Sequence, residues 1–311
     1  MLIIISIIFG NSLVIVTFLR FKKVRKVNNY YIFCLAIADF LTGLIAIPLT
    51  ISNRLIISDF TCQAGTRTLF FLPAYMLTSV SVLLLVAITV DRYIAISRPL
   101  RYPNIMTRRK TIKIVLLMWI LGLGFGSLPS LNFGSDRYQW VCELDLYESE
   151  LITGHSLSGS VGITMVIVFI LVAYGRIIFI AYLKKSTISW SRSAASKSTH
   201  DQMRTRTTVT CGLIVAAFSI CWIPNSFKNL FENYLARDLK SLLTIQTACE
   251  QLCYINCCIN PMIYGWRNHQ FREAYKKIFR NCFGYQRKPK NLRGQTEPKN
   301  VNLSAISFKL Q

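Results

Sequence analysis

Charged and polar side chains inside apolar stretches mark where this chain can do chemistry. Asp91-Arg92-Tyr93 closes an apolar run that begins near Thr68, and Asp39 is the only carboxylate of the run 29–53. A charged group at membrane depth is costly to bury and usually serves a function. An arginine at a helix end can also extend to lipid headgroups, so both interpretations of Arg92 stay open at this point.

The elements that must position these residues are long and apolar. The chain has 311 residues, of which 52% are hydrophobic and only 16% are charged. A transmembrane helix needs about 20 consecutive apolar residues, and several runs reach that length. We therefore expect an all-α membrane protein, a seven-transmembrane helix bundle. Its spans are predicted at residues 1–20, 29–53, 66–96, 112–131, 156–183, 207–231 and 244–266.

The net charge of +22 lies in the segments between the spans, and its density alternates along the chain. Basic residues fill 20–26, 98–113, 184–206 and the part after Arg267, whereas 54–61, 132–155 and 232–243 carry most of the acids. The positive-inside rule then predicts a multi-pass plasma-membrane protein with an extracellular N-terminus and a cytoplasmic C-terminus. A nucleic-acid partner is not expected, because that function needs a basic face on a soluble fold. The first span begins directly at Met1, so we expect a truncated start.

Prolines are expected to kink two of the spans. Pro48 is predicted to kink the second span in its outer half, and Pro224 should kink the sixth span beside Trp222. After the seventh span, residues 267–281 are expected to form a basic amphipathic helix along the inner membrane surface, in contact with lipids. This helix ends a single domain, residues 1–281, which also contains the seven spans. The polar tail 282–311 should be disordered, and Cys282 is a candidate for palmitoylation.

The ordered series of motifs resembles the rhodopsin-like (class A) G-protein-coupled receptors over residues 1–281. The motifs that carry the resemblance are Asn11, Asp39, Asp91-Arg92-Tyr93, Trp119, Cys221-Trp222-Ile223-Pro224 and Asn260-Pro261-Met262-Ile263-Tyr264. The resemblance implies a receptor and not an enzyme. Such a receptor converts binding of an extracellular ligand into activation of a cytoplasmic heterotrimeric G protein, with arrestin and a receptor kinase as further partners.

The resemblance also implies an activation switch. Arg92 would pair with its neighbouring acid at rest and meet the G protein when active, while Tyr174 and Tyr264 would swing toward it. Phe218 and Trp222 would form a packing switch beneath the ligand. The residues expected to serve coupling and activation are Asp91, Arg92, Tyr93, Tyr174, Phe218, Trp222, Pro224, Asn260, Pro261 and Tyr264.

A sodium site is a second implication of the resemblance. The positions that match the family's sodium site are Asp39, Ser81, Trp222, Asn256 and Asn260. Oxygen ligands around a mid-membrane carboxylate suit a hard cation and relieve the buried charge. Allosteric Na⁺ is therefore expected, and no other cofactor.

Three features depart from the family's pattern. Arg204 stands where many relatives have an acid that clamps the arginine, so we expect appreciable basal signalling. Val166 replaces the usual proline of the fifth span. Cys62 and Cys142 resemble the family's third-span-to-loop disulfide, although Cys62 lies about a turn and a half further out than usual.

The ligand-binding candidates face the outer half of the bundle: Tyr75, Thr78, Trp222, Asn225, Asn229, Glu250 and Tyr254. An ordinary amine site is not expected because Ala74 stands where amine receptors need a carboxylate, and retinal is not expected because 244–266 contains no lysine. Glu250 and the acidic outer loop would attract a cation, and the seventh span resembles peptide receptors, so a basic peptide is favoured. The alternative is a small molecule such as a nucleoside or atypical amine. A transporter or channel is the remote alternative, because no inverted repeats are visible.

Overall fold

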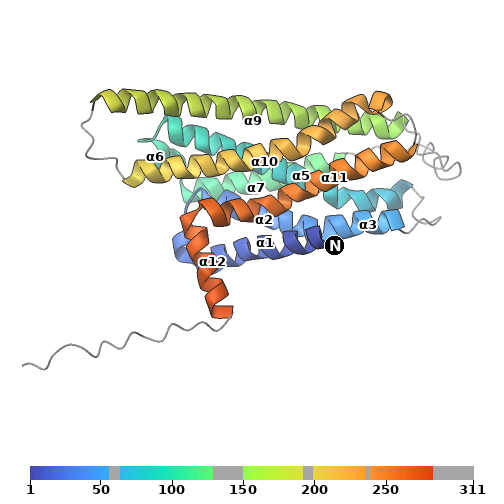
Figure 1. The fold of residues 1–311 in the computed structure, drawn as a ribbon, viewed down its shortest axis with the longest axis horizontal. Helices are drawn as coiled ribbons and strands as arrows, with labels where there is room; N and C mark the ends of the chain where they lie inside the picture. Colours follow the sequence, from blue (N-terminus) through green and yellow to red (C-terminus); the bar gives the residue numbers. More distant parts are fainter. Residues whose placement is uncertain (56–63, 129–149, 192–198, 236–238, 283–311) are drawn as a thin grey trace, which may run out of the picture.

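The computed structural model describes residues 1–55, 64–128, 150–191, 199–235 and 239–282, and the regular secondary structure in this part of the chain is all helical. Figure 1 shows the long helices lying side by side, with α12 turned across them at one end. The helices that run along the bundle are α1 (Leu2–Arg20), α2 (Asn29–Leu41), α3 (Ile47–Leu55), α5 (Ala64–Ser97), α7 (Arg108–Ser127), α9 (Glu150–Ser191), α10 (Thr199–Leu235) and α11 (Leu239–Arg267). The remaining elements are η1 (Lys22–Val24), η2 (Thr42–Ala46), α6 (Tyr102–Ile105) and α12 (His269–Cys282).

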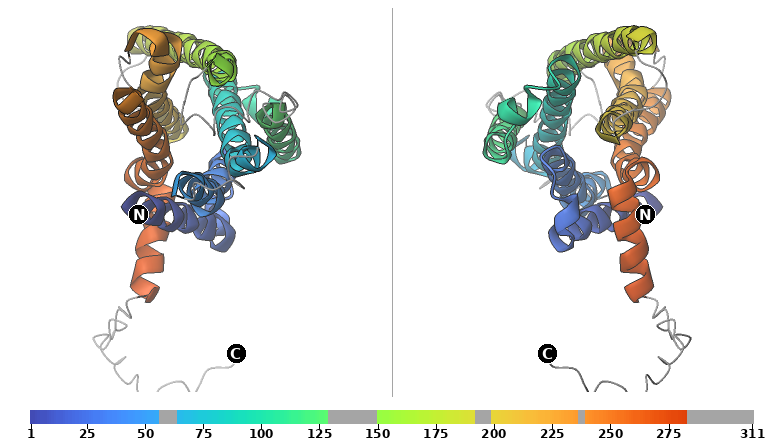
Figure 2. Two further views of the ribbon diagram at one scale, coloured as in Figure 1. Left: turned by 90° about the vertical axis from the view of Figure 1, so that its right-hand side faces the viewer. Right: turned by 90° about the vertical axis from the view of Figure 1, so that its left-hand side faces the viewer.

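Six helical stretches of the described residues are long and apolar enough to cross a membrane. They correspond to the first six predicted spans. The seventh predicted span is α11, which packs against α1 and α10 as a member of the same bundle (Figure 2). Polar residues such as Glu250, Asn256 and Asn260 lower the hydropathy of α11. The side chains of Asn256 and Asn260 are buried against neighbouring helices, which lets a membrane helix carry them. The all-α bundle is confirmed.

The second span is irregular in the turn just before Pro48, the proline predicted to kink it. Residues 42–46 form a π-helical turn, η2, and Pro48 lies just beyond it at the start of α3. Proline has no N–H, and its ring clashes with the carbonyl four residues earlier. That carbonyl belongs to Leu44, inside the π turn, where the wider ring of backbone hydrogen bonds can absorb the clash.

Helices α5 and α7 approach each other through glycines. A Cβ atom on Gly122 would lie 2.6 Å from Cα of Val80, so only a glycine fits at this crossing without a shift of the backbone. Gly126, one turn further along, also faces the α5 backbone, whereas Gly124 faces open space. Small residues spaced by four let membrane helices pack closely, and here they fix α5, which carries Asp91 and Arg92.

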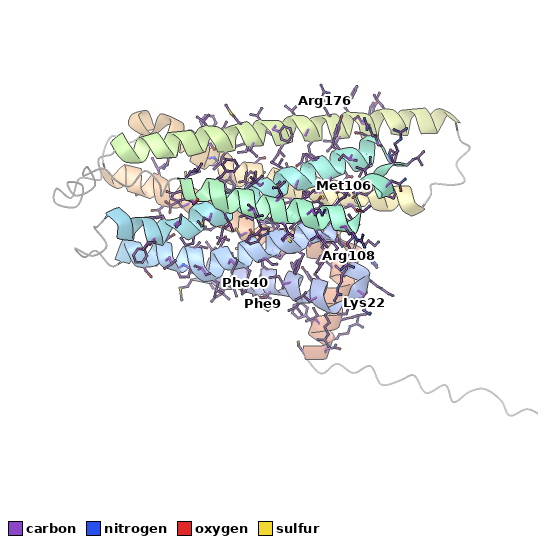
Figure 3. The ribbon with its side chains drawn as sticks, turned by 180° about the vertical axis from the view of Figure 1, so that it is seen from behind. Phe9, Lys22, Phe40, Met106, Arg108 and Arg176 are labelled. Atoms are coloured by element: carbon purple, nitrogen blue, oxygen red, sulfur yellow. The ribbon has the colours of Figure 1, made fainter. Side chains whose placement is uncertain are left out.

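The basic segments meet at one end of the bundle. The elements η1, α6 and α12 lie at this end (Figure 1). Figure 3 shows Lys22 and Arg108 toward this end, whereas Phe9 and Phe40 lie along the middle of the bundle. We call it the basic end, and we call the end where α10 finishes and α11 begins the opposite end. Between them, large apolar side chains are exposed on the outer surface of α7 and α9, among them Leu116, Ile120, Phe125, Met165, Val168 and Val172. Such a surface is what a lipid environment requires.

Candidate functional site

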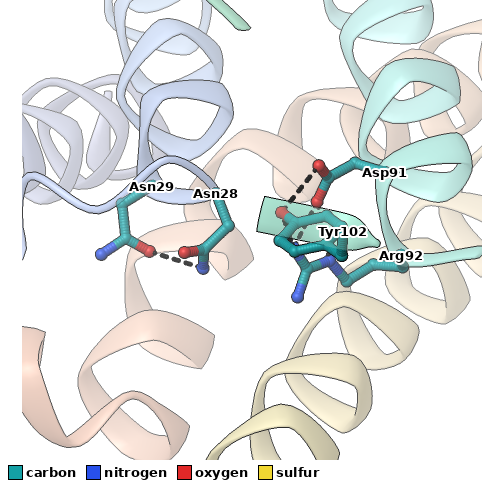
Figure 4. A network of polar contacts seen from close by, with 5 residues as sticks. All are labelled: Asn28, Asn29, Asp91, Arg92 and Tyr102. Carbon is teal, nitrogen blue, oxygen red and sulfur yellow. Dashed lines mark hydrogen bonds and ion pairs between the residues drawn. The ribbon is translucent and has the colours of Figure 1, made fainter. Parts of the chain in front are cut away.

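Asp91, Arg92 and Tyr102 form a closed polar cluster at the basic end (Figure 4). Arg92 is buried, with only 5% exposed, and forms an ion pair with Asp91, in which Nε of Arg92 lies 3.0 Å from Oδ2 of Asp91. The hydroxyl of Tyr102 donates to Oδ1 of Asp91 at 3.0 Å and accepts from Nη2 of Arg92 at 3.2 Å. Each member therefore contacts the other two. Removing one would leave a buried charged or polar group with fewer partners, which is unfavourable.

Tyr102 was not predicted from the sequence. It is the only aromatic residue in the basic segment 98–113, and this was the signal that could have indicated it. It begins the single turn α6, with Pro103 in the first turn, where proline favours a helix start. Burial and the carboxylate of Asp91 raise the pKa of Tyr102 above its ordinary value, so the hydroxyl keeps its proton at neutral pH and can donate.

The three tyrosines of the predicted switch lie in different surroundings. Tyr93 is 38% exposed and lies outside the Arg92 cluster. Tyr174 on α9 and Tyr264 on α11 are buried, and among the described residues their hydroxyls make no hydrogen bond. A buried hydroxyl without a partner is unfavourable by about 1–3 kcal/mol, so a rearrangement that pairs these hydroxyls would be favoured. The geometry is compatible with the predicted swing, which stays a prediction.

Asp39 lies in the middle of the bundle and is fully buried. Nδ2 of Asn260 donates to its Oδ2 at 2.9 Å. The other Asp39 oxygen and the amide oxygens of Asn11, Asn256 and Asn260 are buried and have no hydrogen-bond donor in the described part of the chain. Several buried oxygens without donors fit a hard cation such as Na⁺.

A close contact between α1 and α11 positions this cluster. A Cβ atom on Gly10 would lie 3.1 Å from Cγ of Pro261, so a glycine lets the two helices approach. Beside it, Nδ2 of Asn11 donates to the carbonyls of Ile7 at 2.9 Å and Cys257 at 3.1 Å. The amide of Asn11 therefore joins α1 to α11, the helix that also carries Asn260. Ser81, which the sequence also predicts for the site, is half-buried on α5.

The predicted packing switch is formed by stacked aromatic rings on α10. The rings of Phe218 and Trp222 lie 5.7 Å apart, with Phe218 fully buried and Trp222 half-buried. Pro224 lies inside the helix just beyond Trp222, toward the opposite end. A proline removes one backbone hydrogen bond, so the helix can bend at this point.

The ligand-binding candidates differ in how enclosed they are. Tyr75 is 52% exposed, which makes it the least enclosed of the described candidates. Four further candidates are half-buried: Thr78, Asn225, Glu250 and Tyr254. Tyr254 packs against the small apolar cluster of Ile7, Ile47 and Cys257. The side chain of Asn229 lies outside the described residues.

Several other predictions fall partly or wholly outside the described residues. Cys62 and Cys142 both lie there, as does the tail after Cys282, and so does the side chain of Arg204. Val166 is half-buried on α9 and packs against the core. Cys282 is a free, exposed thiol at the end of α12, so the palmitoylation candidate is accessible.

Comparison with known proteins identifies the family. Residues 10–264 match the sequence model of the seven-transmembrane receptors of the rhodopsin family, and the chain belongs to that family. Its members are receptors rather than enzymes, and the chain is a multi-pass membrane protein. The resemblance seen in the sequence is confirmed.

Several relatives that are 27–29% identical to this chain are receptors named after a particular ligand. The chain is 29% identical to octopamine receptor beta-1R of Drosophila melanogaster, an alignment that covers 91% of this chain and 61% of that receptor. It is 28% identical to the human adenosine receptor A2a, covering 91% of this chain and 71% of the relative. It is 27% identical to the histamine H2 receptor of Rattus norvegicus, covering 88% of this chain and 75% of that receptor.

Proposed function

We propose that this chain is a plasma-membrane receptor that binds a small molecule near the opposite end of its bundle and activates a heterotrimeric G protein at its basic end. The observation that carries the proposal is the buried cluster of Asp91, Arg92 and Tyr102. When an arginine at a helix end is buried in an ion pair, a conformational change can break the pair and expose the guanidinium. Membership of the rhodopsin family supports this use of the cluster.

The proposed orientation places the basic end in the cytoplasm. Lys22, Lys23 and Arg25 lie there, together with the start of α7 and the basic helix α12. Cytoplasmic segments carry an excess of lysine and arginine, so this is the favoured arrangement. A basic cytoplasmic surface also suits anionic lipids, and arrestin and a receptor kinase are the further partners that we propose there.

A small molecule replaces the basic peptide favoured from the sequence as the proposed ligand. The relatives named above are receptors for octopamine, adenosine and histamine, so their names support the alternative. Ala74 still lacks the carboxylate of an ordinary amine site. We therefore propose a nucleoside or an atypical amine as the class of ligand.

Activation follows from a difference in affinity between two conformations. A ligand that binds the active conformation more tightly shifts the population toward it by that difference. The sixth span, α10, would bend at Pro224, and its inner half would move away from α5. Arg92 would then leave Asp91 and Tyr102, while the buried hydroxyls of Tyr174 and Tyr264 would gain partners.

We also propose that Na⁺ binds at Asp39 and stabilises the resting conformation. One oxygen of Asp39 and the amide oxygen of its partner Asn260 are buried without a hydrogen-bond partner in the described residues, as are the amide oxygens of Asn11 and Asn256. A cation would satisfy them and neutralise the carboxylate. Closing the space around Asp39 in the active conformation would release the ion, so Na⁺ and agonist would oppose each other.

Nucleotide exchange tests the proposed function. The purified chain, reconstituted in lipid with heterotrimeric G proteins, should accelerate GTP uptake when adenosine, octopamine or histamine analogues are added. Arg92→Ala should abolish this acceleration, because the released guanidinium is the proposed contact with the G protein. Arg98→Ala, one turn and a half further along at an exposed position, is the matched control and should retain it. Full exchange by a folded Arg92→Ala protein would contradict the proposal.

A further inference from the structure

A lysine is buried in the half of α10 that leads to the opposite end. Lys228 is only 7% exposed. An ammonium carries a full charge and three hydrogen-bond donors. Removing such a group from water is costly unless a partner of opposite charge compensates for the loss. None of the family's motifs in this chain includes Lys228, so its burial needs its own explanation.

The ammonium of Lys228 lies between α10 and α11. Lys228 follows Cys221 by two helical turns, so both side chains project from the same face of α10. That face contacts α11, because Sγ of Cys253 lies 3.8 Å from the carbonyl oxygen of Cys221. Cys249, one turn from Cys253 toward the opposite end, is buried, and Lys228 acts electrostatically on both thiols. The lysine therefore faces a neighbouring helix and does not extend outward to lipid headgroups.

One other charged side chain shares this region. Among the side chains that the structure describes, Lys228 and Glu250 are the only charged ones in the half of the bundle near the opposite end, and Glu250 acts on the same two cysteines. Lys228 takes part in neither of the ion pairs that the structure gives between described residues, Arg92–Asp91 and Lys276–Glu273.

We propose that the ammonium of Lys228 binds an anionic group, a carboxylate or a phosphate, of the small-molecule ligand. This inference rests on the proposed function, because it takes the ligand to bind near the opposite end. Asn225, a ligand-binding candidate, lies one turn inward from Lys228 on the same face of α10. Hydrogen bonds between two ionised groups are the strong class, and a buried ammonium supplies them without a competing water shell.

Matched pairs of compounds test the charge that Lys228 selects. The purified chain in phosphatidylcholine nanodiscs is heated with histamine or histidine, and with adenosine or adenosine 5′-monophosphate, and its melting temperature is measured. Within each pair, the second compound differs by one anionic group. We expect the anionic member of at least one pair to stabilise the protein at a concentration about tenfold lower than its partner, as one charge-assisted contact provides. The first pair reports a carboxylate and the second a phosphate.

Substitutions at Lys228 assign the preference to this residue. Lys228→Met should remove the preference for the anionic member, and Lys228→Arg should keep it, because arginine retains the charge. Lys228→Gln, which keeps hydrogen bonding without charge, provides the same comparison if the methionine variant does not fold. An equal response to both members of every pair, no response to either anionic member, or a preference that survives in the neutral variants would overturn the inference.

A nucleotide-exchange assay on the same samples separates the two proposals. Stabilisation that depends on Lys228 but produces no exchange contradicts the signalling function and leaves the anion site standing. Exchange driven equally by the members of both pairs, and unchanged in Lys228→Met, contradicts the anion site and leaves the signalling function standing.

Discussion

At the scale of single residues, the hydroxyl of Tyr102 determines how firmly Arg92 is held. Tyr102→Phe removes the donor to Asp91 and the acceptor for Arg92 and leaves the ring in place. The resting conformation should lose about 1–2 kcal/mol, which raises basal nucleotide exchange by roughly five- to thirtyfold. Tyr182→Phe is the matched control, because Tyr182 is exposed on α9 and lies outside the cluster. Basal exchange in Tyr102→Phe that equals the wild-type rate would show that the contact does not restrain the receptor.

Asp39 gives the second prediction at this scale. In the wild-type protein, replacing K⁺ by Na⁺ at constant ionic strength should raise the melting temperature and lower agonist affinity, because Na⁺ would bind the resting conformation. Asp39→Asn should remove both effects, since it removes the charge that attracts the cation and leaves a side chain of similar shape. Melting curves and agonist competition curves in the two salts are the measurements. The sodium site is rejected if both proteins respond equally to the two salts.

At the scale of helices, the crossing of α5 and α7 depends on the absence of a side chain. Gly122→Ala would place a Cβ atom 2.6 Å from Cα of Val80, so the helices must separate. We expect a loss of about 1–3 kcal/mol of stability, the usual cost of overpacking. Gly124→Ala, whose Cβ atom would face open space, should be neutral or slightly stabilising. Thermal unfolding of both variants in detergent makes the comparison, and equal melting temperatures would contradict the close approach.

At the scale of the whole molecule, signalling reflects the balance between two arrangements of the bundle. Arg204, near the start of α10, stands where the family resemblance leads us to expect an acid that restrains Arg92, so we predict that the resting conformation forgoes that ion pair. Cells that express this chain should therefore signal above mock-transfected cells without any ligand. Arg204→Glu should restore the restraint and lower basal signalling toward the mock level. Basal signalling that equals the mock level in wild-type cells would contradict this expectation.

Much of the fold was predictable because a membrane leaves few choices. In hydrocarbon, each span must satisfy its own backbone, so long apolar runs become helices, as they do from Leu2 to Arg20 and from Arg108 to Ser127. The π turn before Pro48 was not predictable at the residue level. A proline indicates only that the helix is disturbed nearby, and the packing of its neighbours decides where the backbone absorbs the clash.

The sequence alone determined the class of this protein, the order of its spans and the residues of its motifs, because these depend on apolar run length and residue identity. Only the tertiary structure decided which polar groups meet: Tyr102 with Asp91 and Arg92, and Asn260 with Asp39. Such contacts join residues on different helices, and their existence depends on helix rotation and crossing distance. No local pattern of apolar and polar residues encodes these two quantities.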